Sequence, residues 1–503
     1  MHPKYIILLL LFFLSSSSAI TQNIVVNKRC KLGYTKIIEL RFDDAQTLIG
    51  KEKQDNPNNI YTLYLENYID FLTLFIDENE SFFDQIKGRE DERIEQLELL
   101  PDSSPYKNYL KANIKLQWAI AGLKFQNYFS SALDIRSSYM LINKNRKQFP
   151  DFKPQLITLG VLHVIIGMVP DKYRWILSLI SMDGTVPQGK EELNRALTTT
   201  QNVKQLAYLE PEVLFYLGFI EMNLGLNANR KQQLLNQLSP YSANNLMLTF
   251  LKANMLARSN ENEKALQLLD TATQWQGYHP FYYLYYLKGE YRLRKLDLDA
   301  AKDYLYYTSH FKGINFVKDA WRKAAWSYLI KGDTATYLQL MKKVISEGKT
   351  EVDADKEANE EAVSKKIPST IFIKTRLLFD GGYYDKARQQ LLKVDFSGLT
   401  TEEKLEWFYR LGRIEQKTGN TSKSKKYFMQ TIEQGQKSKR YFAGNAALQL
   451  GAIFEKERDF VSAIKYYKLC RNLDFTEYEM SIKTKAKQGI KRIEERNNNF
   501  QNQ

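Results

Sequence analysis

Leu224-Gly225-Leu226-Asn227 opens a pattern that returns three more times before residue 344, as Ser259-Asn260-Glu261-Asn262, Lys295-Leu296-Asp297-Leu298 and Lys331-Gly332-Asp333-Thr334. Three residues after each quartet stands an equivalent helical position, occupied in turn by Arg230, Ala265, Ala301 and Tyr337. The steps between these positions are 35, 36 and 36 residues. Self-similarity at such a period predicts a solenoid of paired α-helices, in which each pair buries its apolar faces only against its neighbours.

The same spacing continues beyond the central array after one long interruption. The step from Tyr337 to Ala387 is 50 residues, and the next units follow at 37 and 39 residues. Where the two helices of a unit cross, we expect small residues, and where they face the gap we expect large ones. The small set is Ala45, Ala265, Ala301, Ala387 and Ala463, and the large set is Leu269, Leu305, Leu391, Phe428 and Tyr467. Arg230 and Tyr337 depart from this rule, which predicts looser or locally shifted packing in their repeats.

The first unit, residues 29–57, resembles the tetratricopeptide repeat (TPR) pattern, with Leu32-Gly33, Ala45 and Pro57 at the matching relative places. We therefore predict an all-α fold, a right-handed α-helical solenoid of TPR-like helix-turn-helix repeats. The predicted segments are a signal peptide (1–19), divergent N-terminal repeats (29–200) with an atypical buried module (155–197), a central array (206–345), a charged insert (346–366), C-terminal repeats (367–475) and a capping helix (476–496). The cap is predicted from one apolar stripe, Ile482, Ala486, Ile490 and Ile493, on an otherwise basic helix.

Residues 1–19 have the pattern of a secretory signal. Lys4 supplies the positive start, Tyr5–Leu14 is an unbroken apolar run, and Ser15–Ala19 ends in small residues. The alternative is an uncleaved membrane anchor, but ten apolar residues are about half of the roughly 20 that span a bilayer. We therefore expect export to the periplasm or the cell surface and no transmembrane segment after signal removal.

The net charge and the two cysteines limit the classes of partner and the disulfide bonds that the sequence predicts. The chain carries 72 basic and 58 acidic residues, a formal net charge of +14, and its two cysteines, Cys30 and Cys470, lie near opposite ends. Two distant cysteines do not make a disulfide scaffold, and Cys470 is expected to be a packed free thiol. The basic balance fits an acidic partner, peripheral attachment to an anionic envelope surface, or simply a solvated lysine-rich surface, while export argues against nucleic acid.

The module at residues 155–197 is the least typical part of the chain. Leu156–Val169 is almost entirely apolar, so we expect it to be enclosed by helices from both sides. His163 would then be buried as a neutral side chain with a hydrogen-bond partner. Gly160 and Gly167 would permit close helix approach.

This region also carries a family resemblance. Leu159-Gly160-Val161-Leu162-His163, Val169-Pro170-Asp171-Lys172, Asp183-Gly184-Thr185 and Gly189 resemble the central segment of the family that comprises the inclusion-body-clearance proteins and tetratricopeptide repeat protein 39. Secreted bacterial TPR proteins of unassigned function are similar too. The specific part covers about residues 110–200, and it implies a helical-repeat interaction protein.

Motifs for catalysis or cofactors are weak. Gly184–Lys190 has the glycines and lysine of a phosphate-binding loop, but Glu191 stands where that loop needs Ser or Thr. Asp353, Asp355 and Glu357 hint at a calcium loop, but the required glycine is missing, so we interpret them as a solvated charge run. His163, His279 and His310 are isolated from one another. We therefore predict no enzyme activity, no cofactor and no metal.

The remaining candidate site is the concave face built by the first helix of each pair. Projecting TPR geometry onto the central units places ten residues there: Phe215, Phe219, Phe250, Asn254, Arg258, Tyr286, Glu290, Arg294, Arg322 and Trp326. Aromatic and arginine content is typical of binding hot spots. An open alternative is that several of them only pack between repeats.

Three functions fit these observations. The leading hypothesis is a non-enzymatic scaffold that grips a protein or peptide partner in its concave face. The alternative is a cell-surface protein that binds or processes glycans, which the regular period disfavours. A third hypothesis is attachment of the basic surface to anionic lipids, which salt would screen.

Overall fold

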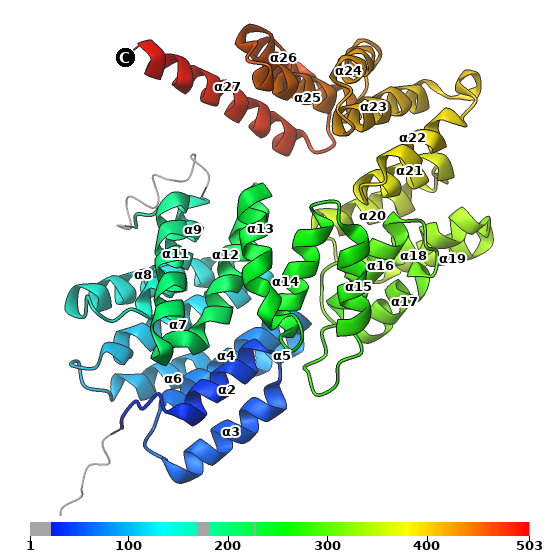
Figure 1. Ribbon diagram of the computed structural model, residues 1–503. Helices are drawn as coiled ribbons and strands as arrows, with labels where there is room; N and C mark the ends of the chain where they lie inside the picture. The colour runs from blue at the N-terminus through cyan, green and yellow to red at the C-terminus, as the bar shows by residue number, and fades with distance from the viewer. Residues whose placement is uncertain (1–21, 170–181, 226–227, 502–503) are drawn as a thin grey trace, which may run out of the picture. The chain divides into compact units, whose positions relative to one another are not determined.

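The computed structural model describes residues 22–169, 182–225 and 228–501. Within these ranges every regular element is a helix, and the one β-type contact is an isolated bridge between Asn23 and Asn59 (Figure 1). The prediction of an all-α fold of helix-turn-helix repeats is confirmed. The predicted signal peptide and the motif residues 170–172 lie outside the described residues.

The chain forms two compact units. Unit 1 comprises the residues up to Met255 together with Gln267–Leu284 and His310–Ile314, and unit 2 comprises Leu256–Leu266, Tyr285–Ser309 and Asn315–Gln503. The division therefore falls inside the central array of residues 206–345. The segment boundaries predicted from the sequence remain predictions.

Unit 1 is built mainly from sequential helices that pack as neighbours, such as α7 with α8 and α9 with α11. Its helices are α2 (Lys28–Ile38), α3 (Phe42–Asp55), α4 (Tyr61–Asp77), α5 (Glu80–Ile86), α6 (Arg89–Glu98), α7 (Pro105–Lys124), α8 (Tyr128–Gln148), α9 (Gln155–Gly167), α11 (Val186–Asn202), α12 (Glu210–Leu224) and α13 (Ala228–Leu238), with 3₁₀ turns at Lys204–Leu209 and Ser239–Tyr241. The unit boundaries fall within or near α14 (Leu246–Ala257), α15 (Asn262–Ala272), α16 (Tyr283–Arg294) and α17 (Ala300–His310).

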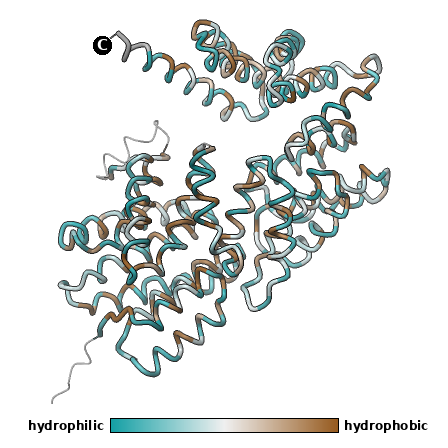
Figure 2. Tube along the Cα trace, in the orientation of Figure 1, coloured by the Kyte–Doolittle hydropathy of each residue, from teal (hydrophilic) through white to brown (hydrophobic). Residues whose placement is uncertain are grey.

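Unit 2 continues the same pairing, with α18 on α19, α21 on α22, α23 on α24 and α25 on α26. Its remaining helices are α18 (Val317–Lys331), α19 (Thr334–Ser346), α20 (Asp353–Ser364), α21 (Thr370–Asp380), α22 (Tyr384–Leu392), α23 (Thr401–Lys417), α24 (Thr421–Gly435), α25 (Phe442–Lys456), α26 (Phe460–Asn472) and α27 (Glu479–Gln501), with a 3₁₀ turn at Phe396–Gly398. Hydrophobic and hydrophilic residues alternate along most of these helices, as amphipathic packing requires (Figure 2).

Glycines on the first helices explain how closely the pairs pack. A Cβ on Gly412 would lie 2.7 Å from the ring of Phe428, and one on Gly451 would lie 2.5 Å from the ring of Tyr467. Each ring of the second helix therefore rests on a glycine of the first. The five predicted small alanines are all buried, and so are four of the five large partners. The prediction for the fifth, Leu305, is wrong. Leu305 is only partly buried, and Tyr304 packs on Gly289 in its place.

The atypical module is enclosed as predicted. Ten of the 13 residues of α9 are buried, including His163, whose Nδ1 lies 2.5 Å from the Glu192 carboxylate. The expected partner is therefore confirmed, and it is an acidic group. A Cβ on Gly167 would lie 2.7 Å from the carbonyl carbon of Thr185, and one on Gly160 would lie 2.6 Å from Cγ of Leu193. Both glycines thus sit where helix α9 meets the start of α11.

The C-terminal helix follows the predicted pattern. The cap stripe Ile482, Ala486, Ile490 and Ile493 is buried along α27, and the helix continues to Gln501. Cys470 is a buried free thiol, as predicted, and Cys30 is one as well. Among the described residues, no helix is both long and apolar enough to cross a membrane.

The interpretation of Asp353–Glu357 as a solvated charge run is wrong. This stretch begins helix α20, which packs on α18 and α19, and Asp355 is completely buried. Its carboxylate accepts hydrogen bonds from the backbone N–H groups of Phe316 (2.6 Å) and Asp319 (2.9 Å). Asp355 is therefore a buried acceptor for backbone amides at the start of α18.

Candidate functional site

Five of the ten predicted site residues form a stripe on two neighbouring first helices of unit 2. Tyr286, Glu290 and Arg294 follow one another at four-residue spacing on α16, and Arg322 and Trp326 have the same spacing on α18. Residues four apart lie on one face of a helix, so each helix presents one row. The rows meet through side-chain contacts between α16 and α18, which we call the inner-face network.

Asp319, on the first turn of α18, is the centre of the inner-face network. Its carboxylate accepts hydrogen bonds from the Tyr286 hydroxyl (2.5 Å) and Arg322 Nε (3.1 Å), and lies 2.7 Å from Lys323 Nζ. Lys323 also lies 2.7 Å from Glu290, which accepts a hydrogen bond from the Tyr304 hydroxyl. Along the network, each carboxylate therefore lies next to a cationic side chain that balances its charge.

Electrostatics hold this network in its charged form. Burial raises the pKa of Asp319, but the cationic groups of Lys323 and Arg322 outweigh burial, so the net pKa lies well below its usual range. The same balance, with Lys323 and Arg294 as the cations, lowers the pKa of Glu290. Both carboxylates are therefore ionised at neutral pH, as a network built on ion pairs requires.

Burial changes the role that the sequence predicted for three of these residues. Tyr286, Arg322 and Trp326 are each 4% exposed, so their side chains do not face solvent. The alternative that some candidates pack inside the protein therefore holds for these three. The predicted binding role of the ten residues as a set is not tested by the structure.

Helix α20 is what covers Arg322 and Trp326. Glu361 accepts a hydrogen bond from Trp326 Nε1 (2.8 Å) and from the hydroxyl of Tyr337 (3.4 Å), and it lies 3.8 Å from Arg322 Nη1. Glu357, one turn earlier, lies 3.8 Å from the same nitrogen. Tyr337 is 2% exposed, so the large residue that broke the small-residue rule reaches α20 with its hydroxyl.

The inner face continues onto helices that the sequence analysis did not select. Arg376 on α21 is 43% exposed at its side chain and lies 3.9 Å from Glu357. On α23, Arg413 donates to the Tyr409 hydroxyl (3.0 Å), and Gln416 donates to Gln449 of α25 (3.1 Å). Extending the helical projection past the 50-residue step would have found Arg376 and Arg413, because Arg376 stands 50 residues after Trp326 and Arg413 stands 37 residues after Arg376.

The other four aromatic and amide candidates lie in unit 1. Phe215 and Phe219 stack on α12 with ring centroids 6.0 Å apart, and Phe219 is 42% exposed. Phe250 on α14 packs against Phe281, and Asn254 donates back to the Phe250 carbonyl (3.0 Å). These four residues belong to unit 1, whereas the inner-face network belongs to unit 2.

Arg258, the tenth candidate, belongs to unit 2 and is exposed. Its exposure is compatible with the predicted binding role.

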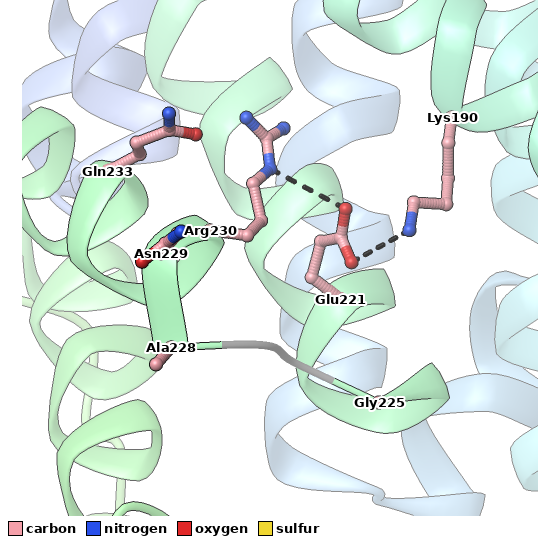
Figure 3. Close-up of a pocket in the computed structure, with 7 residues that line it drawn as sticks. All are labelled: Lys190, Glu221, Gly225, Ala228, Asn229, Arg230 and Gln233. Atoms are coloured by element: carbon pink, nitrogen blue, oxygen red, sulfur yellow. Dashed lines mark hydrogen bonds and ion pairs between the residues drawn. The ribbon is translucent and has the colours of Figure 1, made fainter.

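A charged depression in unit 1 includes the lysine of the phosphate-loop motif. Its volume is about 580 Å³, and Figure 3 shows Glu221 between Lys190 (2.8 Å) and Arg230 (3.5 Å). Thr185 caps α11 by accepting from the Gln188 N–H, so the motif is a helix start. Arg230, which breaks the small-residue rule, also donates to Asn194.

Two of the histidines lie next to carboxylates in the described part of the chain. Across that part of the chain, no three His, Cys, Asp or Glu side chains gather as a metal site would need. His163 is paired with Glu192, and His279 lies 2.9 Å from Asp77.

Comparison with known proteins supports the helical-repeat assignment. Residues 154–283 match the family model described as Iml2/Tetratricopeptide repeat protein 39. This confirms the recognition of the chain as a TPR-type protein, and the match includes the module around Gly160 and Gly189 that suggested the resemblance. A comparison with curated proteins finds no match.

Among solved structures, the chain is similar to one titled "Crystal Structure of Rap Protein Complexed with Competence and Sporulation Factor". The identity is 13%, and the match covers 92% of this chain and 98% of that chain, with a TM-score of 0.24. At these values the likeness extends neither to function nor to overall shape.

Proposed function

We propose that this protein is a non-enzymatic, exported scaffold that binds a peptide or protein partner through the inner face of unit 2. The observation that carries the proposal is the row of arginine, aromatic and amide side chains on successive first helices. Arg376 on α21, Arg413 and Gln416 on α23, and Gln449 on α25 continue the inner-face network. Such residues bind extended or helical peptides through hydrogen bonds and stacking rather than through reaction chemistry.

Arg376 is the best-placed binding residue. Its guanidinium is part exposed and lies 5.9 Å from the Trp326 ring centroid, 3.8 Å from Asp380 and 3.9 Å from Glu357. These ion-pair distances are long, so a carboxylate from a partner can approach more closely and exchange for them. The proposed partner therefore carries acidic groups, in keeping with the net charge of +14.

The test is photo-crosslinking and affinity capture from a cell-envelope fraction with the full chain. The Arg376→Ala/Arg413→Ala variant should lose the captured partner. The matched control, Lys423→Ala/Lys468→Ala, removes two exposed positive charges from second helices and should retain it. Equal capture by both variants, or capture of nothing specific, would count against the scaffold; glycan binding on a polysaccharide array would favour the alternative.

Export is a separate part of the proposal and rests on the pattern of residues 1–19. Expression with the native N-terminus should yield a protein that begins after Ala19 and fractionates with the periplasm or medium. N-terminal sequencing of the purified protein checks this. An intact N-terminus in the cytoplasm would remove the exported location and leave the binding proposal untouched.

A further inference from the structure

Helix α20 is an insertion into the repeat array that occupies the face proposed to bind the partner. The step of 50 residues between Tyr337 and Ala387 leaves room for it, and it packs on α18 and α19 ahead of α21. Its carboxylates, rather than apolar side chains, make the contacts with Arg322, Trp326 and Tyr337. The insertion therefore resembles a bound acidic helix.

The composition of the α20 interface argues that it is weakly held. The buried residues of α20 are Asp355, Ala358 and Ala362. Two alanines bury little apolar area, and hydrophobic stabilisation scales with that area. Most of the attachment is thus ionic and hydrogen-bonded, through groups that a competitor can supply equally well.

The contacts of α20 define which side chains a competing helix needs and at what spacing. Glu357 and Glu361 are four residues apart, so they lie on one face of the helix. Glu361 meets Trp326, while Glu357 reaches Arg376 and accepts a hydrogen bond from the Tyr478 hydroxyl. Asp355, half a turn earlier, caps the start of α18. The buried Ala358 and Ala362, one before and one after Glu361, let the helix lie close to α18.

We propose that α20 is an internal occupant of the inner face, and that the partner is an acidic helix with two carboxylates four residues apart, which competes with α20. This inference rests on the proposed scaffold function and names the chemistry of its partner. Displacement of α20 would uncover Arg322, Trp326 and Tyr337 and free the hydroxyl of Tyr478 for the incoming helix. Binding is then slower and weaker than the open face would allow, because α20 must leave first.

The experiment uses the full chain and a fluorescent peptide of residues 350–367 as the probe. In Glu357→Gln/Glu361→Gln the internal helix loses both charged contacts, and the variant should bind the peptide about tenfold more tightly than the wild type, in fluorescence anisotropy. The control, Glu351→Gln/Glu360→Gln, makes the same charge change at exposed positions and should bind as the wild type does. A peptide with Gln at both contact positions should not bind.

Hydrogen exchange provides a second measurement that does not depend on peptide affinity. Amides of α20 should exchange faster than those of α18 and α19 in the wild type, and faster still when the peptide is present. Exchange of α20 as slow as that of α18, or equal peptide affinity in both double variants, would show that α20 is a permanent part of the fold. A partner captured through Arg376 and Arg413 that ignores Glu357 and Glu361 would preserve the scaffold and refute the role of α20.

Discussion

In each unit a carboxylate lies at the centre of a buried hydrogen-bond cluster, Glu212 in unit 1 and Asp319 in unit 2, and the two differ in what surrounds them. In unit 1, Glu212 of α12 accepts hydrogen bonds from two tyrosine hydroxyls, those of Tyr34 and Tyr68. In unit 2, Asp319 meets one tyrosine and two cations, Arg322 and Lys323. Both carboxylates are at most 5% exposed.

The difference shows that burial alone does not decide the charge of an acidic group. Burial raises the pKa of Glu212, and the hydroxyl donors only reduce that rise. Burial acts on Asp319 in the same direction, but the neighbouring cations reverse the net shift. The surroundings of Glu212 in unit 1 therefore favour its protonated form, whereas those of Asp319 in unit 2 favour its ionised form.

The largest expected effect comes from neutralising Asp319. Asp319→Asn leaves Arg322 and Lys323 buried without their closest counter-charge, and removing one partner of a buried ion pair costs about 3–5 kcal/mol. Chemical denaturation monitored for unit 2 should show a loss of this size. Asp380→Asn is the control, because that carboxylate is 46% exposed and 3.8 Å from Arg376, where a surface pair is worth about 0–1 kcal/mol. Equal losses in the two variants would contradict the network.

The next largest loss of stability should come from overpacking in unit 1, by Gly167→Leu, and this loss should not depend on pH. In Gly167→Leu the new side chain meets backbone atoms of Thr185 and Val186, which cannot rotate away. Overpacking of this kind costs about 1–3 kcal/mol. Thermal melting, together with limited proteolysis between residues 155 and 169, measures it. Gly50→Leu is the control, because a Cβ there meets nothing within 4 Å; an unchanged melt for Gly167→Leu would refute the close approach.

Neutralising Glu212 should have a smaller effect, with a distinctive pH dependence. Glu212→Gln keeps an oxygen acceptor for the tyrosines and should cost about 1 kcal/mol or less near pH 5. Because the folded state raises the pKa of Glu212, the wild type takes up a proton on folding and loses that stability as pH rises from about 4.5. The free energy of unfolding of the variant should therefore rise relative to that of the wild type as the pH increases above about 4.5. If the free energies of unfolding of the wild type and the variant changed with pH in parallel, Glu212 would be ionised in the folded protein, and the prediction would be wrong.

The smallest effect concerns the two thiols, one in each unit. Burial raises the pKa of Cys30 to about 11 and that of Cys470 to about 12, and both are at most 1% exposed. Since the thiolate is the reactive form, neither should be alkylated by iodoacetamide at pH 7.5 in the native protein. Mass spectrometry before and after denaturation checks this. Rapid labelling of either thiol in the native state would show that its unit opens.

Repeat spacing was enough to predict the helix pairs, the buried alanines and the apolar stripe of α27. These are local consequences of helical geometry, because residues at fixed spacing share one face. The close approach at Gly160 and Gly167 followed from the same reasoning, since an apolar helix must be enclosed. The candidate face was predicted less well: the spacing placed Tyr286, Arg322 and Trp326 on the correct helices but could not show what covers them.

The sequence by itself determined the repeat architecture, because helix propensity, small residues and apolar period all act within one unit and its neighbour. Only the tertiary structure decided which polar residues are buried and which residues are their hydrogen-bond partners. Glu212 meets Tyr34, 178 residues earlier, and Tyr478 meets Glu357, 121 residues earlier. No local period encodes such pairs, and the free energy of a buried charge depends on the partners that surround it after folding. The same reason turned Asp355 from an apparently solvated charge into a buried acceptor at the start of α18.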